Sequence, residues 1–150
     1  MKRNLFDNEC TENLVERVRK VKPGSMPLWG TMNATEMLLH CNRINEQLLT
    51  APPLKKGTRF KQYIGRWLVL YLLPTFPKNA RTPTRNNTKG QVDGSAFAEQ
   101  QQTFIDLIRR FPVHAKPIQL PHPYFGDLDK KQWGLAGYKH IDHHLRQFGV

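Results

Sequence analysis

The last segment of the chain, from Asp129 to Phe148, constrains the fold most, because both of its ends carry helix signals. Asp129 is a good N-cap, and Gln132 follows three residues later, where its side chain can reach back to the cap amide as in a capping box. Gly149 is a natural stop. The sequence therefore predicts a long helix that begins near Asp129 and ends near Phe148.

This predicted helix carries three histidines within five positions, His140, His143 and His144, out of six in the chain. Successive side chains on a helix are about 100° apart, so an apolar face can be assigned. That face is formed by four residues, Gly137, Ile141, Leu145 and Phe148. His140 and His144 lie at its margin, whereas His143 lies about 100° farther from it than His144. The spacing predicts that His140 and His144 face the core and that His143 lies towards the solvent.

Two histidines four residues apart on one helix can bind a metal ion together. Their spacing lets one ring nitrogen of each converge on the same ion, as in the helix of zinc proteases. The same spacing also arises when two histidines at a helix surface hydrogen-bond to their neighbours. The pair His140 and His144, taken alone, leaves both interpretations open.

An earlier helix is predicted to begin at Asn33, with Glu36 at the capping-box position. Its apolar stripe is formed by four residues, Met37, Cys41, Ile44 and Leu48. His40 lies within about 60° of the centre of that stripe, where an unpaired imidazole would leave buried nitrogens unsatisfied. His40 is therefore either hydrogen-bonded in the core or a metal ligand. Cys41 is expected to be a small core residue rather than a ligand.

The remaining chain is predicted as helices separated by breaks at Pro and Gly. A first helix covers residues 8–21, and another starts near Ser95 and stops before Pro112. The stretch from Phe60 to Leu73 is hydrophobic nearly all round in its second half, which predicts a central helix. The long basic connection from Pro74 to Gly94 is expected outside the bundle, as a crossover or a flap. Convincing alternating strands are absent from the sequence, so we predict an all-α fold.

The length and the charge of the chain limit its class. At 150 residues it fits one domain, residues 1–150, and can bury a core without disulfides. Its net charge of +11 suggests attraction to anions without identifying them. A nucleic-acid module usually interleaves basic residues with exposed aromatic residues or carries a recognition element, and we find neither pattern. A solvated basic surface is therefore favoured, with a nucleic-acid partner as the alternative.

The compartment follows from the cysteines and from the apolar runs. Cys10 and Cys41 lie in predicted helices without a secretory context, which favours reduced thiols in the cytoplasm. The N-terminal segment has basic residues but not the apolar run that a signal peptide requires. The most apolar run, Trp67–Leu73, is too short to span a bilayer as a helix. The sequence predicts a soluble cytoplasmic protein with no membrane partner.

Three segments of the chain carry a family resemblance: WGTMNATEMLLHC from Trp29 to Cys41, HPYFGDLDKKQW from His122 to Trp133, and KHIDHHLRQFG from Lys139 to Gly149. Together they resemble the DinB-like superfamily. More closely, they resemble a small branch of it with no settled function, whose members share W-G, M-x-x-H and H-x-x-H-H-x-x-Q-F signatures. The match spans nearly the whole chain, with its parts in the right order.

The resemblance implies a four-helix bundle with a long crossover and an additional short helix, often forming a homodimer. It also implies a divalent metal on one histidine of the second helix and two of the last, which are His40, His140 and His144 here. The metal is expected to be zinc, nickel or iron, although three neutral imidazoles suit copper as well and so do not name the ion. His122, which precedes Pro123, is expected to brace the HPYFG turn or to lie in the outer shell of the site.

Three functions stay open on this basis. Some relatives are thiol-dependent transferases or hydrolases, in which the metal lowers the pKa of a bound thiol or water. The basic loop from Lys78 to Lys89 would then attract a small anionic thiol. The second possibility is a non-catalytic metal-binding helical module, and the third is a basic nucleic-acid-binding protein. The sequence offers no carboxylate or tyrosine that can be assigned as a general base.

Overall fold

The computed structural model describes residues 3–54, 57–78 and 86–150. The chain is mostly helical, which confirms the all-α prediction, although a short antiparallel hairpin was not foreseen. The elements are α1 (Asn8–Lys20), α2 (Ala34–Thr50), α3 (Phe60–Trp67), the π-helix η1 (Leu68–Leu72), the 3-10 turn η3 (Gly94–Ala96), α4 (Phe97–Arg109), β1 (Pro121–His122), β2 (Gly126–Asp127) and α5 (Lys130–Gln147).

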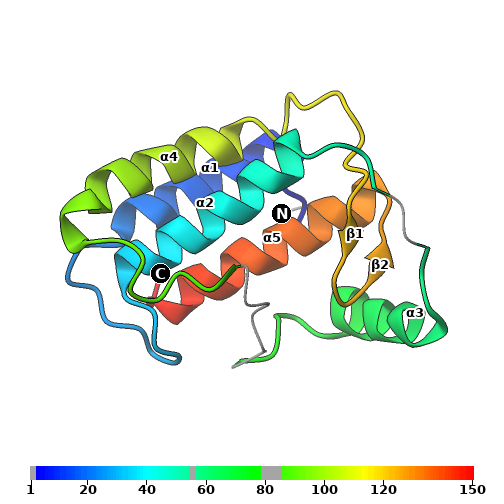
Figure 1. Cartoon of the computed structure of the whole chain (residues 1–150), viewed down its shortest axis with the longest axis horizontal. Helices are drawn as coiled ribbons and strands as arrows, with labels where there is room; N and C mark the ends of the chain where they lie inside the picture. The colour runs from blue at the N-terminus through cyan, green and yellow to red at the C-terminus, as the bar shows by residue number, and fades with distance from the viewer. Residues whose placement is uncertain (1–2, 55–56, 79–85) are drawn as a thin grey trace.

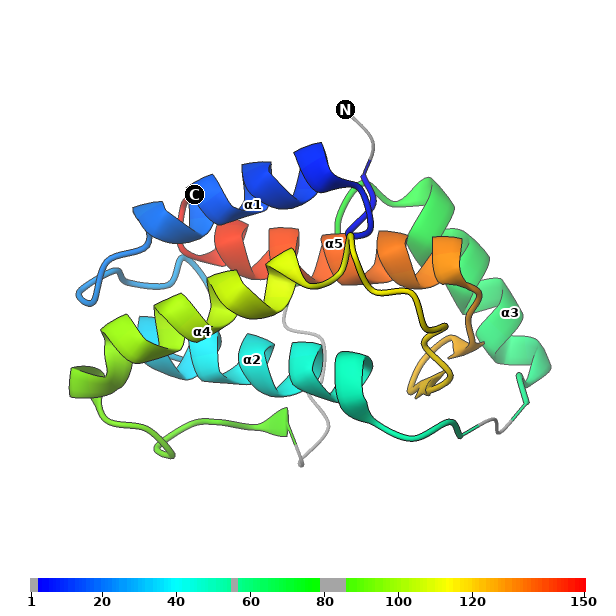
Figure 2. The same cartoon turned by 90° about the horizontal axis from the view of Figure 1, so that it is seen from above.

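Four long helices, α1, α2, α4 and α5, lie side by side (Figures 1 and 2). The short helix α3 and the hairpin of β1 and β2 lie at the end of the molecule where α5 begins (Figure 1). In the hairpin, Pro121 pairs with Asp127 and His122 pairs with Gly126. None of the described helices is long and apolar enough to cross a membrane.

The predicted capping boxes fix the starts of the two helices that carry the histidines. At α2, the Glu36 amide donates to Asn33 Oδ1 (2.9 Å), and the Asn33 amide donates to a Glu36 carboxylate oxygen (2.8 Å). At α5, Gln132 and Asp129 make the equivalent pair of bonds at 2.7 and 3.2 Å. Both predictions are confirmed. Because a helix has a fixed repeat, these starts also fix which side chains face inwards.

The apolar faces that the periodicity predicts are buried between the long helices. They contribute to one core, which includes Met37, Cys41, Leu48, Phe104, Ile108, Ile141 and Leu145. The N-terminal segment crosses α5 closely, since the Leu5 amide donates to the Gly134 carbonyl (3.0 Å). A Cβ at Gly137 would come within 2.8 Å of the Leu5 side chain. Leu5 therefore packs directly on α5 at Gly137, where a larger residue would clash with it.

The prediction of a helix from Phe60 to Leu73 is confirmed, since α3 and η1 together cover Phe60–Leu72, but the prediction that this helix is central is wrong. Among the described residues of α3 none is buried, and in η1 Leu70 alone is. The helix lies outside the group of four long helices (Figure 2). The expectation that exposed aromatic residues do not accompany the basic ones is also wrong here, since Phe60 and Trp67 are exposed beside Lys61.

The connection between η1 and η3 is described in its first and last parts. Most of the basic loop from Lys78 to Lys89 falls outside the described residues. Its last part lies against the start of α2, where the Thr88 hydroxyl donates to the Glu36 carbonyl (2.7 Å). The Gly90 amide donates to the Glu36 carboxylate (2.6 Å). These bonds place Asn86 beside α2.

Candidate metal centre

His40 lies on the inner side of α2 and is almost fully buried, with 3% of its surface exposed. Its Nδ1 is 2.7 Å from the carbonyl oxygen of Asn86. A carbonyl oxygen can only accept, so Nδ1 carries the proton and donates. The lone pair of the neutral ring is then on Nε2, which lies 3.2 Å from Nε2 of His140. The backbone at Asn86 thereby sets the tautomer in which His40 can bind a metal through Nε2.

His144 on α5 is held in the same tautomer by a glutamine one turn later. Its Nδ1 is 2.9 Å from Oε1 of Gln147, and Nε2 of Gln147 donates to the Trp29 carbonyl (2.6 Å). Because the Trp29 oxygen can only accept, the NH2 group of the Gln147 amide must face Trp29. Its oxygen, Oε1, therefore faces His144. Nδ1 of His144 is therefore the donor, and the lone pair is again on Nε2.

Gly30 makes room for this glutamine. It has a φ of 81°, and a Cβ there would lie 2.6 Å from Nε2 of Gln147. A side chain would thus be strained by the backbone and would displace the amide. Two signatures noted in the sequence, Trp29-Gly30 and the final Gln147-Phe148, therefore meet in one contact. No role was predicted for Gln147 or Asn86 from the sequence. The position of Gln147, three residues after His144 on the same helix, was the signal that could have indicated their hydrogen bond.

His40, His140 and His144 come together between α2 and α5. The centroids of their rings are 5.3 Å apart for His40 and His140, 4.9 Å for His40 and His144, and 4.8 Å for His140 and His144. One ligand nitrogen of each lies within 4.8 Å of the others, and this group could hold a metal ion. A metal-ligating histidine typically donates its second ring N–H to an oxygen acceptor, as His40 does to Asn86 and His144 does to Gln147.

The surroundings keep the three imidazoles neutral. Burial, together with repulsion from nearby His40, lowers the pKa of His144 to about 3. Burial lowers the pKa of His140 well below its ordinary value, with added repulsion from His144 and His40. Burial also lowers the pKa of His40. Neutral imidazole is the form that binds metal ions, so the donor set fits a divalent cation at neutral pH.

Cys41 takes no part in this group. Its thiol lies in the core, 3.9 Å from the sulfur of Met37, and burial raises its pKa far above the ordinary value. A thiol with such a pKa stays protonated at neutral pH and is a poor ligand. The interpretation of Cys41 as a core residue is confirmed.

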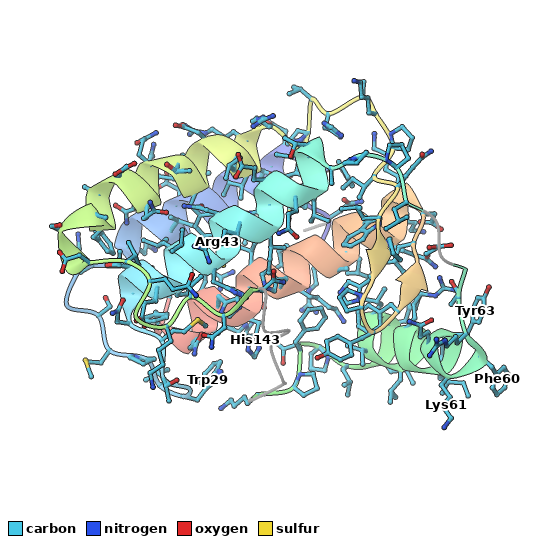
Figure 3. The ribbon with its side chains drawn as sticks, viewed as in Figure 1. Trp29, Arg43, Phe60, Lys61, Tyr63 and His143 are labelled. Atoms are coloured by element: carbon cyan, nitrogen blue, oxygen red, sulfur yellow. The ribbon has the colours of Figure 1, made fainter. Side chains whose placement is uncertain are left out.

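The other two histidines near the site have different surroundings. His143 does not belong to the group of three, although its ring centroid lies 5.3 Å from that of His144. It meets the ring of Trp29 edge to face, with centroids 5.6 Å apart (Figure 3). His122 Nδ1 accepts from the Tyr124 amide (3.2 Å), and its ring stacks on Phe125 at 4.2 Å. Burial lowers the pKa of His122 to about 4. The prediction that His122 braces the HPYFG turn is confirmed.

A cavity of about 1300 Å³ opens directly on the three histidines. Its wall is formed by α2, α3, η1, the hairpin and α5, and its apolar lining includes Ile44, Leu48, Val69, Leu120, Phe125 and Ala136. Asn45 and Trp133 also line it, and each has a buried nitrogen that has no hydrogen-bond partner among the described residues. A largely apolar cavity with a few polar groups is typical of a small-molecule site.

The family described as "Protein of unknown function (DUF1569)" matches residues 2–149. The chain belongs to this family. The DUF1569 match includes the three histidines together with Gly30 and Gln147. Comparison with curated proteins and with solved structures gave no match.

In this DUF1569 protein, Gln147→Leu should lower the affinity for zinc by about 10- to 100-fold, because His144 loses the acceptor that fixes its tautomer. The measurement is a competition titration with a chromophoric chelator. Arg146→Leu is the matched control, since Arg146 is exposed and binds Asp142 instead of a histidine. Equal zinc affinities in the wild-type and Gln147→Leu proteins would mean that this bond does not support the site.

Proposed function

We propose that this chain is a metal-dependent enzyme that holds a divalent ion on His40, His140 and His144 and acts on a small molecule in the adjoining cavity. The observation that carries the proposal is the position of the three neutral imidazoles on the wall of that cavity. A structural metal site is usually closed by four protein ligands, whereas a catalytic site keeps a position open. Three histidines beside a cavity match the second arrangement.

The donor set suits zinc, nickel or iron, and nothing in its chemistry selects one of them. When bound, a divalent ion supplies Lewis acidity, which lowers the pKa of a thiol or a water molecule that joins it. The chain itself orients the imidazoles through Asn86 and Gln147 and lines much of the cavity with apolar side chains.

Thiol transfer is favoured over hydrolysis by the groups around the cavity. Of the described residues that line it, none is Asp or Glu, so a carboxylate base for activating water is absent from that wall. A thiol has a lower pKa than water and needs less help to ionise. Arg59 lines the cavity and, with the buried nitrogens of Asn45 and Trp133, would suit a thiol that carries acidic or carbonyl oxygens.

The same lack of a carboxylate is the observation that favours a second candidate, a non-catalytic metal-binding module. In that case the ion would stabilise the packing of α2 against α5 without turnover. Chelation would then lower the melting temperature and remove no activity.

The proposal includes the architecture that the family resemblance implies. We propose a DinB-like four-helix bundle in which the long segment between α2 and α4 is the crossover. This is supported by the four long helices that lie side by side and by the position of α3 in that segment (Figure 2). The histidines come from α2 and α5, on either side of the crossover in the sequence.

The test is an activity screen on metal-free protein reloaded separately with zinc, nickel and iron. Low-molecular-weight thiols are offered with an electrophilic acceptor, and the loss of free thiol is followed. We expect turnover that requires metal and is abolished by His40→Ala, while His114→Ala, which changes a histidine outside the site, keeps it. Metal-loaded protein that stays inactive but melts at a lower temperature after chelation would support the non-catalytic module instead.

A further inference from the structure

The outer face of α3 and η1 carries a row of exposed apolar side chains. Phe60, Ile64, Trp67 and Tyr71 form the row, and the exposed fractions of Phe60 and Trp67 are 78% and 59%. Their spacing of four, three and four residues places them on one face of the helix. Aliphatic side chains flank the row, since Leu68 and Leu72 are also exposed. An apolar face of this kind on a soluble chain marks an interaction site.

The helix is nevertheless firmly attached by its opposite face. The Lys139 ammonium donates to the carbonyls of Val69 (2.7 Å) and Leu73 (2.6 Å). The Arg66 guanidinium donates to the Asp127 carbonyl (2.8 Å). Val69 also lines the cavity. The outer row is therefore held outwards by specific contacts, and the helix cannot bury it by turning over without breaking them.

The sequence around this helix is uniformly basic. From Gln47 to Val92 it contains no Asp or Glu, whereas it contains nine Lys or Arg residues. Arg66 lies on the attached face and Arg59 lines the cavity, so among the described residues of α3 Lys61 is the basic side chain that accompanies the exposed row. On α3, the side chains of Lys61 and Phe60 both project away from the long helices, Lys61 about 100° round the helix from Phe60 (Figure 3). The partner of this face should therefore be apolar at depth and negatively charged at its surface.

We propose that α3 and η1 dock on the surface of an anionic lipid bilayer. Phe60, Trp67 and Tyr71 would lie at the boundary of headgroups and acyl chains, where aromatic side chains are favoured. Ile64 would reach slightly deeper. Basic side chains such as Lys61 extend from the helix to the lipid phosphates and gain from the negative surface potential. The helix lies in the plane of the interface and does not cross the bilayer.

Two other partners fit the face less well. A second copy of the chain would bring two basic segments together around a symmetric contact, and like charges oppose such an interface. A homodimer through another face is compatible with lipid docking. Single-stranded nucleic acid would stack on the aromatic rings, but Ile64, Leu68 and Leu72 offer it no stacking surface.

The docking proposal replaces the expectation of no membrane partner, which rested on the lack of a spanning segment.

The proposal is tested by sedimentation of the full chain with lipid vesicles. Vesicles of phosphatidylcholine alone are compared with an equal mixture of phosphatidylcholine and phosphatidylglycerol. We expect binding to the anionic vesicles in preference to the neutral ones, weakened by salt because surface charges are screened. The double substitution Phe60→Ser with Trp67→Ser should lower the partition coefficient by about tenfold or more, because it removes two apolar contacts with the lipid.

The matched control is Met26→Ser with Val113→Ser, which removes two apolar side chains outside α3 that are at least as exposed as Phe60 and Trp67. It should bind vesicles as the wild type does. In the wild type, brominated lipid should quench tryptophan fluorescence, which gives a readout that needs no variant. The proposal is overturned if the wild type does not bind anionic vesicles or if both double variants bind equally well. It is also overturned if the α3 variant instead converts a dimer to a monomer, or loses affinity for single-stranded DNA, without a change in vesicle binding.

Discussion

His144→Ala protein should purify almost free of metal, whereas His143→Ala protein should retain about one ion per chain. The two residues are adjacent, yet the helix turns them to different neighbours. His144 lies with His40 and His140 in the group that could hold a metal ion, and Gln147 directs its free lone pair there. His143 packs on Trp29 at the edge of the helix. The measurement is metal content by mass spectrometry after exhaustive desalting.

Circular dichroism of both variants provides the control, since each should keep the helical spectrum of the wild type. A loss of metal from His143→Ala with retention in His144→Ala would show that α5 is rotated differently from the arrangement described above. Equal retention in both would remove the three-histidine group as the principal site.

Arg17→Met should lower the free energy of unfolding by about 2 kcal/mol, because the Asp142 carboxylate loses a charged hydrogen bond in a buried place. Asp142 has only 4% of its side chain exposed, and it accepts from Arg17 (2.8 Å) and from Arg146 (2.8 Å). Arg17 also donates to the Val150 carbonyl (2.9 Å). These bonds tie α1 to α5 beside the histidines. Urea denaturation followed by circular dichroism measures the change.

The control on the same helix is Arg19→Met. Arg19 pairs with Glu16 at 2.8 Å, but both side chains are more than half exposed. Such pairs contribute little, so the expected change stays within about 0.5 kcal/mol. Similar losses in the two variants would mean that Asp142 is adequately paired by Arg146 and that Arg17 does not fix the position of α5.

The sequence was sufficient to predict the parts of the site that depend on helix periodicity. The capping residues Asn33 and Asp129 set where α2 and α5 begin, and the repeat then placed the inward-facing histidines. The convergence of His40 with the pair on α5 follows once the apolar faces of the two helices contribute to the same core. The preference for His144 over His143 rested on a single helical step of about 100°.

The parts that escaped prediction depend on contacts between distant segments. The bond from Gln147 to the Trp29 carbonyl spans 118 residues, and that from His40 to Asn86 spans 46. Local patterns carry no signal for such pairings. The placement of α3 failed because hydrophobicity on all sides does not by itself fix burial: the segment is helical, yet Phe60 and Trp67 are exposed. Strands of two residues, as in the hairpin at His122, are too short to show alternation.

The most direct test of the metal site is elemental analysis of untagged protein, purified without chelators. The three neutral imidazoles of His40, His140 and His144 predict about one zinc, nickel or iron ion per chain, which survives desalting and is removed by a strong chelator. Protein that contains no such ion, and takes up none when each metal is offered in excess and then desalted, would contradict the account.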